Sequence, residues 1–333
     1  MKKLLCILLT FLLILTLSSC ASDKAEERSF EAMDTVMHFK TYGYSYAPDF
    51  MEKLAGVLDS LLSTEDEESD IYRLNHNGSA NLGADALALI KRSLSLSADL
   101  KAYFDPTVYP AVCEWGFISG DHHVPDEKRL KELAAHIDSA KVKVVGTTVT
   151  LPKDTAIDLG AVAKGYLADE CRNALEVSEA PCAIWNLGGT ILLYGKKPDG
   201  SDFKVGVADP ENPASYFGYL TCGEGIVATS GGYERYFEEG GKRYIHILDP
   251  TTAKPVDNGT LSVTVFSQDG VLSDALSTAL FVMGADKAAE YRRTRKDFDY
   301  IILTDDNKLY LSEGIYDDFS LESGYDYEMI KVQ

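Results

Sequence analysis

The sequence SDALSTALFVMG, residues Ser273–Gly284, is the stretch on which the fold and the function depend most. Its apolar spacing predicts a helix over Ser273–Met283, and residues four apart share one face of a helix. Asp274 and Thr278 have that spacing, so a carboxylate and a hydroxyl lie together as ligands of a hard divalent cation do. The alternative is that Asp274 only caps the helix or favours its dipole, with Thr278 at the edge of the core.

A second stretch, DLGAVAKGY (Asp158–Tyr166), adds a cationic side chain. We expect a strand over Thr155–Asp158, a glycine turn, and a helix over Val162–Val177. Lys164 falls in the first turn of that helix, where its charge opposes the positive end of the helix dipole. Such a placement indicates an anionic partner, for example a phosphate. The alternative is a surface lysine beside a structural aspartate.

Two further features of this stretch point the same way. Gly165 weakens the helix, and sequences most often break local rules at working sites. The backbone carbonyl of Ala161 offers an oxygen that could complete the ligands of a cation held by Asp274 and Thr278. Together the two stretches indicate metal-assisted phosphoryl chemistry.

The N-terminus predicts export and lipidation. Lys2 and Lys3 precede the apolar run Leu4–Leu17, and the sequence LSSC then ends at Cys20 in the pattern of a lipobox. We expect residues 1–19 to be a lipoprotein signal peptide, residues 20–29 a polar tether lipidated at Cys20, and residues 30–333 the folded domain. A membrane-spanning helix is the alternative, but it needs about 20 apolar residues.

Charge and cysteine content exclude two classes of partner. The formal net charge of −20 repels nucleic acid, so we expect no nucleic-acid partner, and a phosphate ligand needs a local cation. Beyond Cys20, the cysteines are far apart and form no Cys-x-x-Cys pair, so zinc is not expected. We predict buried free thiols, although an exported protein permits disulfides. The residues are Cys113, Cys171, Cys182 and Cys222.

The remaining patterns predict an α+β fold with a mixed sheet and flanking helices. Alternating residues favour a first strand over Phe30–Tyr42, and short apolar runs separated by Gly and Pro predict more strands in the second half. Helical spacing occurs in four further segments. Besides the two helices above, we expect helices over Phe50–Ser63, Ala84–Tyr103, Asp126–Ser139 and Ala285–Arg293.

Glycine-rich turns and an aromatic stretch supply further candidates. Asn186–Thr190 and Ala228–Tyr233 let a backbone approach a ligand closely, or are simply hairpin turns. His246 before Asp249-Pro250 could orient a phosphate or could be a satisfied core residue. The aromatic residues of Phe104–Phe117 could stack on a planar ring, although such residues more often build core.

The ordered set of motifs closely resembles the FAD:protein FMN transferase (ApbE) family from about Phe30 to about Arg293. The motifs that carry the resemblance are Met33-Asp34-Thr35, Ser69–Asn75, Phe104–Val108, Trp115-Gly116-Phe117, Asp158–Gly165, Leu187-Gly188-Gly189, Thr229-Ser230-Gly231, His246–Pro250 and Ser273–Gly284. Two positions depart from the family pattern. Asp34 replaces the usual glycine of Met-Gly-Thr, and Ala253 stands where Asp-Pro-x-Thr-Gly has glycine.

The resemblance implies an ApbE-like fold and a set of site residues. It implies Mg²⁺ held by Asp274, Thr278 and the backbone of Ala161. It implies catalytic roles for Asp274, Lys164, His246 and Asp249. It also implies that FAD, the substrate, lies across Met33, Tyr72, Tyr103, Phe104, Asp105, Asp158, Lys164, Ser230, Ile247 and Leu248.

The implied reaction transfers FMN from FAD to a Thr or Ser hydroxyl of an exported flavoprotein, such as a subunit of a membrane redox complex, and releases AMP. Acceptors of the family carry an Asp-x-Ser/Thr-Gly-Ala-Thr type of motif. Two alternatives stay open: a pyrophosphatase that yields FMN and AMP, and a lipoprotein that binds FAD without turnover. The expected location is the extracytoplasmic face of the cell membrane, through the lipid anchor.

Overall fold

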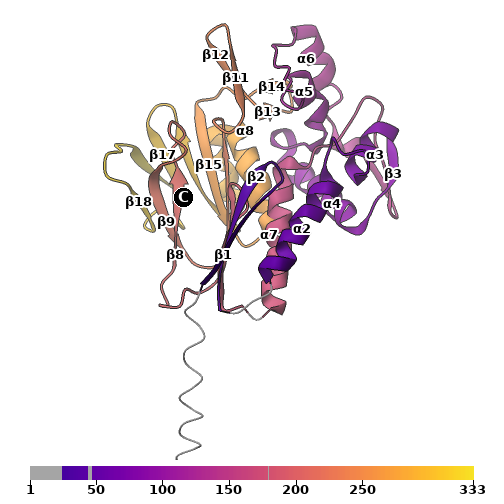
Figure 1. The fold of residues 1–333 in the computed structure, drawn as a ribbon. Helices are drawn as coiled ribbons and strands as arrows, with labels where there is room; N and C mark the ends of the chain where they lie inside the picture. The colour runs from indigo at the N-terminus through magenta and orange to yellow at the C-terminus, as the bar shows by residue number, and fades with distance from the viewer. Residues whose placement is uncertain (1–24, 44–46, 179) are drawn as a thin grey trace, which may run out of the picture.

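The computed structural model describes residues 25–43, 47–178 and 180–333 (Figure 1). The predicted signal peptide and the lipidation site Cys20 lie outside these residues. Across the described ranges, we find no helix whose length and apolarity would let it cross a membrane.

A nine-stranded sheet runs through the middle of the described molecule in the order β1-β2-β6-β7-β10-β15-β16-β17-β19. Neighbouring strands pair antiparallel except β17 and β19, which pair in parallel. The sheet is therefore mixed, as predicted. Its strands are β1 (Ala25–Ala32), β2 (Thr35–Tyr42), β6 (Cys182–Asn186), β7 (Thr190–Gly195), β10 (Gly225–Gly231), β15 (Thr260–Ser267), β16 (Phe298–Thr304), β17 (Lys308–Ser312) and β19 (Glu328–Val332).

Helices cover one face of this sheet. Successive residues of a strand point to opposite faces, so neighbouring residues belong to different cores. Trp185, Leu192 and Ile226 belong to the large core shared with the helices. Leu193 and Val227, one residue further along their strands, belong to a second core on the other face. The helices of the large core are α2 (Ala47–Leu62), α4 (Ala84–Leu100), α7 (Gly160–Val177) and α8 (Gly270–Thr294).

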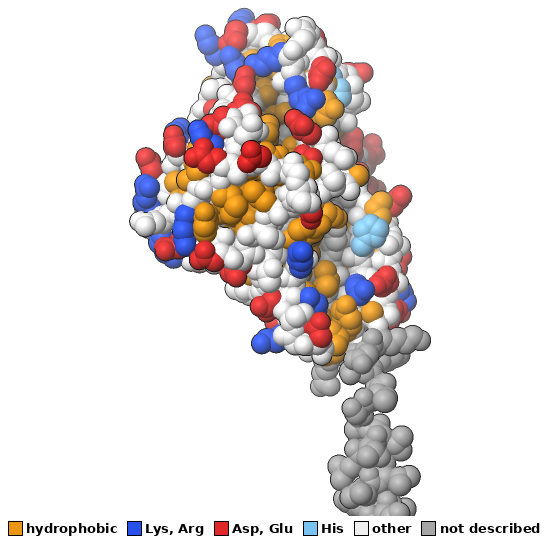
Figure 2. Space-filling view, turned by 90° about the vertical axis from the view of Figure 1, so that its left-hand side faces the viewer, with side chains coloured by type: hydrophobic (Ala, Val, Ile, Leu, Met, Phe, Trp, Pro, Cys, Tyr) orange, Lys and Arg blue, Asp and Glu red, His pale blue; other side chains and the backbone are white. Residues whose placement is uncertain are grey.

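A small sheet covers the opposite face of the large sheet. It has the order β18-β9-β8 and contributes Phe203, Phe217 and Leu220 to the second core. Figure 2 views the molecule from this side, where a hydrophobic area at mid-height is bordered by charged side chains of both signs. The strands are β8 (Phe203–Ala208), β9 (Tyr216–Cys222) and β18 (Phe319–Leu321).

Shorter elements lie outside these layers, and α5, α6 and the β11–β12 hairpin lie together at one end of the molecule (Figure 1). Trp115 and Phe117 form a third core there, with Phe237 and Tyr244 of the hairpin packed against it. The elements are α3 (Asp70–Asn77), β3 (Ser79–Asn81), η1 (Lys101–Tyr103), η2 (Pro106–Val108), α5 (Tyr109–Glu114), α6 (Glu127–Ala134), η3 (Ser139–Lys141), β4 (Lys143–Val145), β5 (Thr148–Thr150), β11 (Tyr236–Glu239), β12 (Lys242–Ile245), β13 (Leu248–Asp249) and β14 (Lys254–Pro255).

The predicted first strand, the tether and one predicted helix have other bounds in the structure. The strand expected over Phe30–Tyr42 is a hairpin, because Met33 and Asp34 turn the chain with φ of 50° and 57°. β1 begins at Ala25, so residues 25–29, which were predicted to belong to the tether, are part of a strand. The helix expected over Asp126–Ser139 ends at Ala134.

The segment Thr155–Asp158 is extended but is not a strand. The backbone of Ile157 bonds to a side chain instead: the Asn75 amide donates to Ile157 O at 2.9 Å and accepts from Ile157 N at 2.7 Å. One amide thus supplies the pair of bonds that a neighbouring strand would supply.

The two helices expected over Ser273–Met283 and Ala285–Arg293 follow one another within α8. Gly284 separates them, with a φ of 73° and a ψ of 169° that no helix contains. The break was therefore placed correctly, whereas the beginning of the first helix was not.

Candidate active site

Helices α7 and α8 touch at two glycines. A Cβ on Gly165 would lie 2.1 Å from the Gly270 carbonyl oxygen, and a Cβ on Gly270 would lie 2.2 Å from the Gly165 carbonyl oxygen. The Gly165 N–H also donates to Asp274 Oδ2 at 2.9 Å. Gly165 is thus required by the close approach of two helices, which is a packing reason that sequence reasoning did not give it.

Asp274 lies inside α8 rather than at its start. The helix begins at Gly270, and its N-cap is Asp269, whose Oδ1 accepts from Leu272 N at 2.9 Å. The interpretation of Asp274 as a cap is therefore wrong. Its residue is 6% exposed, and Thr278 follows one turn later on the same face.

One pocket gathers most of the predicted site residues, although they come from segments far apart in the sequence. Ala161 and Lys164 come from α7, Asp274 and Thr278 from α8, and Ser230 from β10. The predicted residues that line this pocket are Tyr103, Phe104, Asp105, Asp158, Ala161, Lys164, Ser230, His246, Ile247, Leu248, Asp274 and Thr278. The convergence of α7 and α8 that the sequence argument required is present.

Three predicted residues do not line this pocket. Met33 lies in the β1–β2 turn, next to Asp34, whose carboxylate pairs with Arg235 of the pocket at 3.2 Å. Tyr72 stacks on His76 with ring centroids 3.7 Å apart. Asp249 Oδ1 accepts from the backbone and the hydroxyl of Thr251, at 2.8 and 2.6 Å, and so stabilises its own turn.

Two charged pocket residues were missed by the sequence argument. Glu234 and Arg235 follow the glycine-rich end of β10 and line the pocket beside Lys164. Their signal in the sequence is a pair of charged residues directly after Gly231-Gly232 and Tyr233. Phe117 lines the pocket as well, while Trp115 belongs to the core and donates its indole N–H to Ala253 O at 2.8 Å.

Acidic side chains outnumber basic ones in the lining of the pocket. Burial raises the pKa of the Asp158, Glu234 and Asp274 carboxyls, because a low-dielectric environment disfavours the charged form. The cationic groups that line the pocket are Lys164 and Arg235. The Lys164 ammonium donates to Gly188 O at 2.7 Å, in the β6–β7 turn. An anionic ligand would therefore need additional positive charge.

The oxygens around Asp274 fit a hard divalent cation. Asp274 has no salt bridge among the described residues, and the pocket beside it is also lined by Thr278 and Ala161. Ser230 Oγ lies 3.3 Å from Thr278 Oγ1 and adds another hydroxyl. Among the residues the structure describes, no three His, Cys, Asp or Glu side chains form a metal cluster. A cation here would thus depend on hydroxyl and backbone oxygens as well as one carboxylate.

His246 is neutral at pH 7. Burial lowers its pKa to about 4, and the positive charges of Arg235 and Lys164 act in the same direction. Its Nδ1 lies 3.2 Å from Arg235 O. Because a carbonyl oxygen only accepts, Nδ1 carries the proton, and Nε2 keeps a free lone pair.

The remaining cysteines agree with the prediction of free thiols. Cys171, Cys182 and Cys222 are buried and unpaired, whereas Cys113 is free but exposed. Burial raises the pKa of Cys182 to about 11 and that of Cys222 to about 12, so these thiols are structural rather than reactive.

Comparisons with known proteins agree on one family. The sequence matches the ApbE family over residues 33–302. An FAD:protein FMN transferase of Klebsiella pneumoniae is 34% identical over 275 residues, which cover 80% of this chain and 85% of the relative. One of Haemophilus influenzae is 29% identical over 333 residues, with coverages of 92% and 95%.

Solved structures agree with the sequence matches. An ApbE protein of Thermotoga maritima has a TM-score of 0.81 at 29% identity and covers 87% of this chain and 98% of its own. The apo form of the flavinyl transferase ApbE of Pseudomonas stutzeri has a TM-score of 0.76 at 25% identity, with coverages of 86% and 93%.

Proposed function

This chain belongs to the ApbE family and is an FAD:protein FMN transferase, and from that premise we propose that it uses Mg²⁺ to transfer FMN to a Thr or Ser hydroxyl of an exported flavoprotein. The acceptor oxygen forms a bond to the FMN phosphorus. The bond between that phosphorus and the bridging oxygen breaks, and its electron pair leaves with AMP. The observation that carries this proposal is the meeting of Ala161, Lys164, Asp274 and Thr278 in one pocket.

We propose that Mg²⁺ is held by Asp274, Thr278 and the Ala161 carbonyl. A bound cation would neutralise the phosphates and the negative charge that develops on AMP. The support is electrostatic: four acidic side chains but only two cationic ones, Lys164 and Arg235, line this pocket, so the protein's own charges do not attract a pyrophosphate.

The chain's own residues have distinct tasks in this proposal. Lys164 reaches the pocket from α7 and offsets phosphate charge. His246 presents Nε2 with its lone pair, so it can orient the acceptor hydroxyl or take its proton. We assign the proton-accepting role to His246 rather than Asp249, because the Asp249 carboxylate already accepts hydrogen bonds from Thr251 in its own turn. Phe104 and Phe117 supply apolar surface for a planar ring.

The location is part of the proposal. A signal peptide over residues 1–19 and lipid on Cys20 would put the enzyme on the extracytoplasmic face of the membrane, where exported acceptors fold. Growth with a radiolabelled fatty acid should label the wild-type chain, and the Cys20→Ala variant should stay unlabelled. Equal labelling of both would remove the lipid anchor.

The direct test mixes the detergent-solubilised full chain with FAD, Mg²⁺ and an acceptor that carries an Asp-x-Ser/Thr-Gly-Ala-Thr type of motif. Denaturing gels should show flavin fluorescence on the acceptor, and AMP should appear in equal amount. Free FMN with AMP would instead indicate a pyrophosphatase, and tight FAD binding without AMP would indicate a binding protein.

The matched variants both lie on α8. Asp274→Asn should abolish labelling, because it removes the carboxylate charge from the pocket. Asp286→Asn removes the same charge from an exposed position of the same helix and should label the acceptor normally. Labelling by Asp274→Asn at the wild-type rate would contradict the proposed metal site.

A further inference from the structure

Helices α7 and α8 contact each other along two rows of residues. Ala161, Gly165 and Asp169 are four apart on α7, and Gly270, Asp274 and Thr278 are four apart on α8, so each row follows one helix face. The rows run in opposite directions. Asp169 meets the start of α8, Gly165 meets Gly270 and Asp274, and Ala161 shares the pocket with Asp274 and Thr278.

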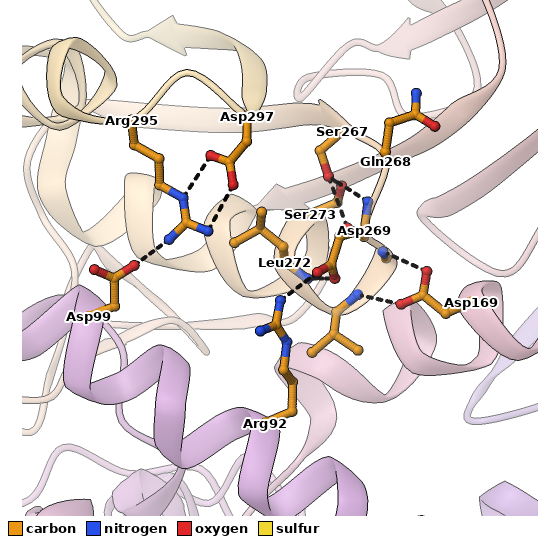
Figure 3. A network of polar contacts seen from close by, with 12 residues as sticks. Arg92, Asp99, Asp169, Ser267, Gln268, Asp269, Leu272, Ser273, Arg295 and Asp297 are labelled. Atoms are coloured by element: carbon orange, nitrogen blue, oxygen red, sulfur yellow. Dashed lines mark hydrogen bonds and ion pairs between the residues drawn. The ribbon is translucent and has the colours of Figure 1, made fainter.

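Asp169 holds the beginning of α8. Its Oδ1 accepts from Gly270 N at 2.8 Å and its Oδ2 accepts from Val271 N at 3.2 Å. These are first-turn N–H groups, which have no partner within their own helix. Figure 3 shows the Asp169 carboxylate directed at the first turn of α8. One side chain of α7 therefore sets where α8 begins.

Two arginines outside the two rows also hold the beginning of α8. Arg92 of α4 forms an ion pair with Asp269, the N-cap of α8. Arg172, one turn after Asp169 on α7, donates from its NH1 group to Gln268 O at 2.6 Å. The residues just before α8 are thus held by two other helices, so the start of α8 has little freedom to slide.

We propose that Asp169 is a positioning residue for the Mg²⁺ and pyrophosphate site, an inference that rests on the proposed function. Asp169 does not line the pocket. It lies eight residues from Ala161, which is about 12 Å along a helix, and it acts by fixing the register of α8 against α7. That register decides whether the Ala161 carbonyl and the Asp274 carboxylate face the same point.

A purely structural role makes a different prediction, and the chain offers a matched control. Asp99 lies on α4, where it pairs with Arg295 and accepts from the Tyr291 hydroxyl at 3.1 Å (Figure 3 shows Asp99 and Arg295). This contact holds the far end of α8. Its loss weakens helix packing without touching the row that leads to the site.

The experiment compares the wild type with Asp169→Ala, Asp169→Asn and Asp99→Asn in the full chain. Two quantities are measured: the Mg²⁺ concentration for half-maximal transfer, and the rise in melting temperature that Mg²⁺ causes without acceptor. Asp169→Ala should raise the half-saturating Mg²⁺ concentration about tenfold to hundredfold, as loss of supporting contacts around a metal site does. The KM for FAD at saturating Mg²⁺ should change much less.

Asp169→Asn keeps one acceptor oxygen, since an amide NH₂ group only donates. Its half-saturating Mg²⁺ concentration should therefore fall between those of the wild type and Asp169→Ala. Asp99→Asn should lower the melting temperature and leave the Mg²⁺ response within about twofold of the wild type, because it lies outside the metal's supporting contacts.

The inference is overturned if Asp169→Ala melts at a lower temperature but keeps the wild-type Mg²⁺ response. Should that variant fail to fold, Asp169→Asn decides, and a wild-type Mg²⁺ response there overturns the inference too. A wild type that transfers FMN without any Mg²⁺ response contradicts the proposed metal itself. The two failures are distinguished by whether the wild type responds.

Discussion

Replacing Gly165 with alanine should destabilise the protein, although alanine is the better helix former by about 1 kcal/mol. The added Cβ would lie 2.1 Å from the Gly270 carbonyl oxygen and 2.9 Å from the Asp274 Cβ. Non-bonded carbon atoms normally sit about 3.5 Å or more apart, so α7 and α8 must separate by roughly 1 Å. Overpacking of this kind costs about 3 kcal/mol at the upper end of its usual range.

The expected net loss is therefore about 2 kcal/mol in the free energy of unfolding, measured by chemical denaturation. The transfer rate should also fall, by about a hundredfold, because a shift of about 1 Å between reacting groups has that effect. Gly56→Ala is the control. Gly56 lies in α2 and has no atom within 4 Å of an added Cβ, so this variant should be slightly more stable than the wild type.

A double variant tests the reasoning most sharply. Gly270→Ala puts a Cβ 2.2 Å from the Gly165 carbonyl oxygen, so both single changes force the same separation of the helices. The loss in the free energy of unfolding of the double variant should then be smaller than the sum of the two single losses, by about 1 kcal/mol or more, because the two sites are in contact. Additive losses, or a Gly165→Ala variant as stable as the wild type, would refute the explanation.

Three further outcomes are expected. Ala253→Gly should stabilise the protein by about 1 kcal/mol in chemical denaturation, because Ala253 has a φ of 57°, which only glycine adopts without strain. His246 has a folded pKa of about 4 against an ordinary 6.5, so its contribution to stability is complete above pH 6.5 and is lost as the pH falls toward 4. The wild type should lose more stability than His246→Gln over that range, by at most about 3 kcal/mol; an equal pH dependence of both would contradict this. Mg²⁺ at about 100 times its dissociation constant should stabilise the wild type by about 2.7 kcal/mol in thermal melts and should leave the melting temperature of Asp274→Asn unchanged.

The two site helices were predictable because their apolar spacing is local. That Ala161 and Asp274 meet in one pocket came from a resemblance, since nothing in either segment encodes which partner it packs on. The start of α8 was missed for a related reason. Asp269 is a residue type that often caps a helix, and the helix begins directly after it at Gly270. The prediction began at Ser273 instead, because the apolar spacing from there on was enough to indicate a helix.

Other failures come from side chains that replace backbone structure. Asn75 holds Ile157 as a strand would, and no short-range pattern reveals a partner 82 residues away. The turn at Met33-Asp34 lacks glycine, so the alternating residues around it resembled one strand. Glu234 and Arg235 line the pocket only because β10 ends there, which depends on the whole sheet.

The hydrogen bond between Gly165 and Asp274 joins positions 109 residues apart in the chain. Contacts of such long range form late, because the loop between them must first be closed. A partly folded chain in which α8 has not yet packed on α7 therefore lacks the proposed Mg²⁺ site, and proteolytic fragments that end before α8 should not transfer FMN. Transfer activity therefore indicates that the C-terminal part of the chain, including α8, has folded.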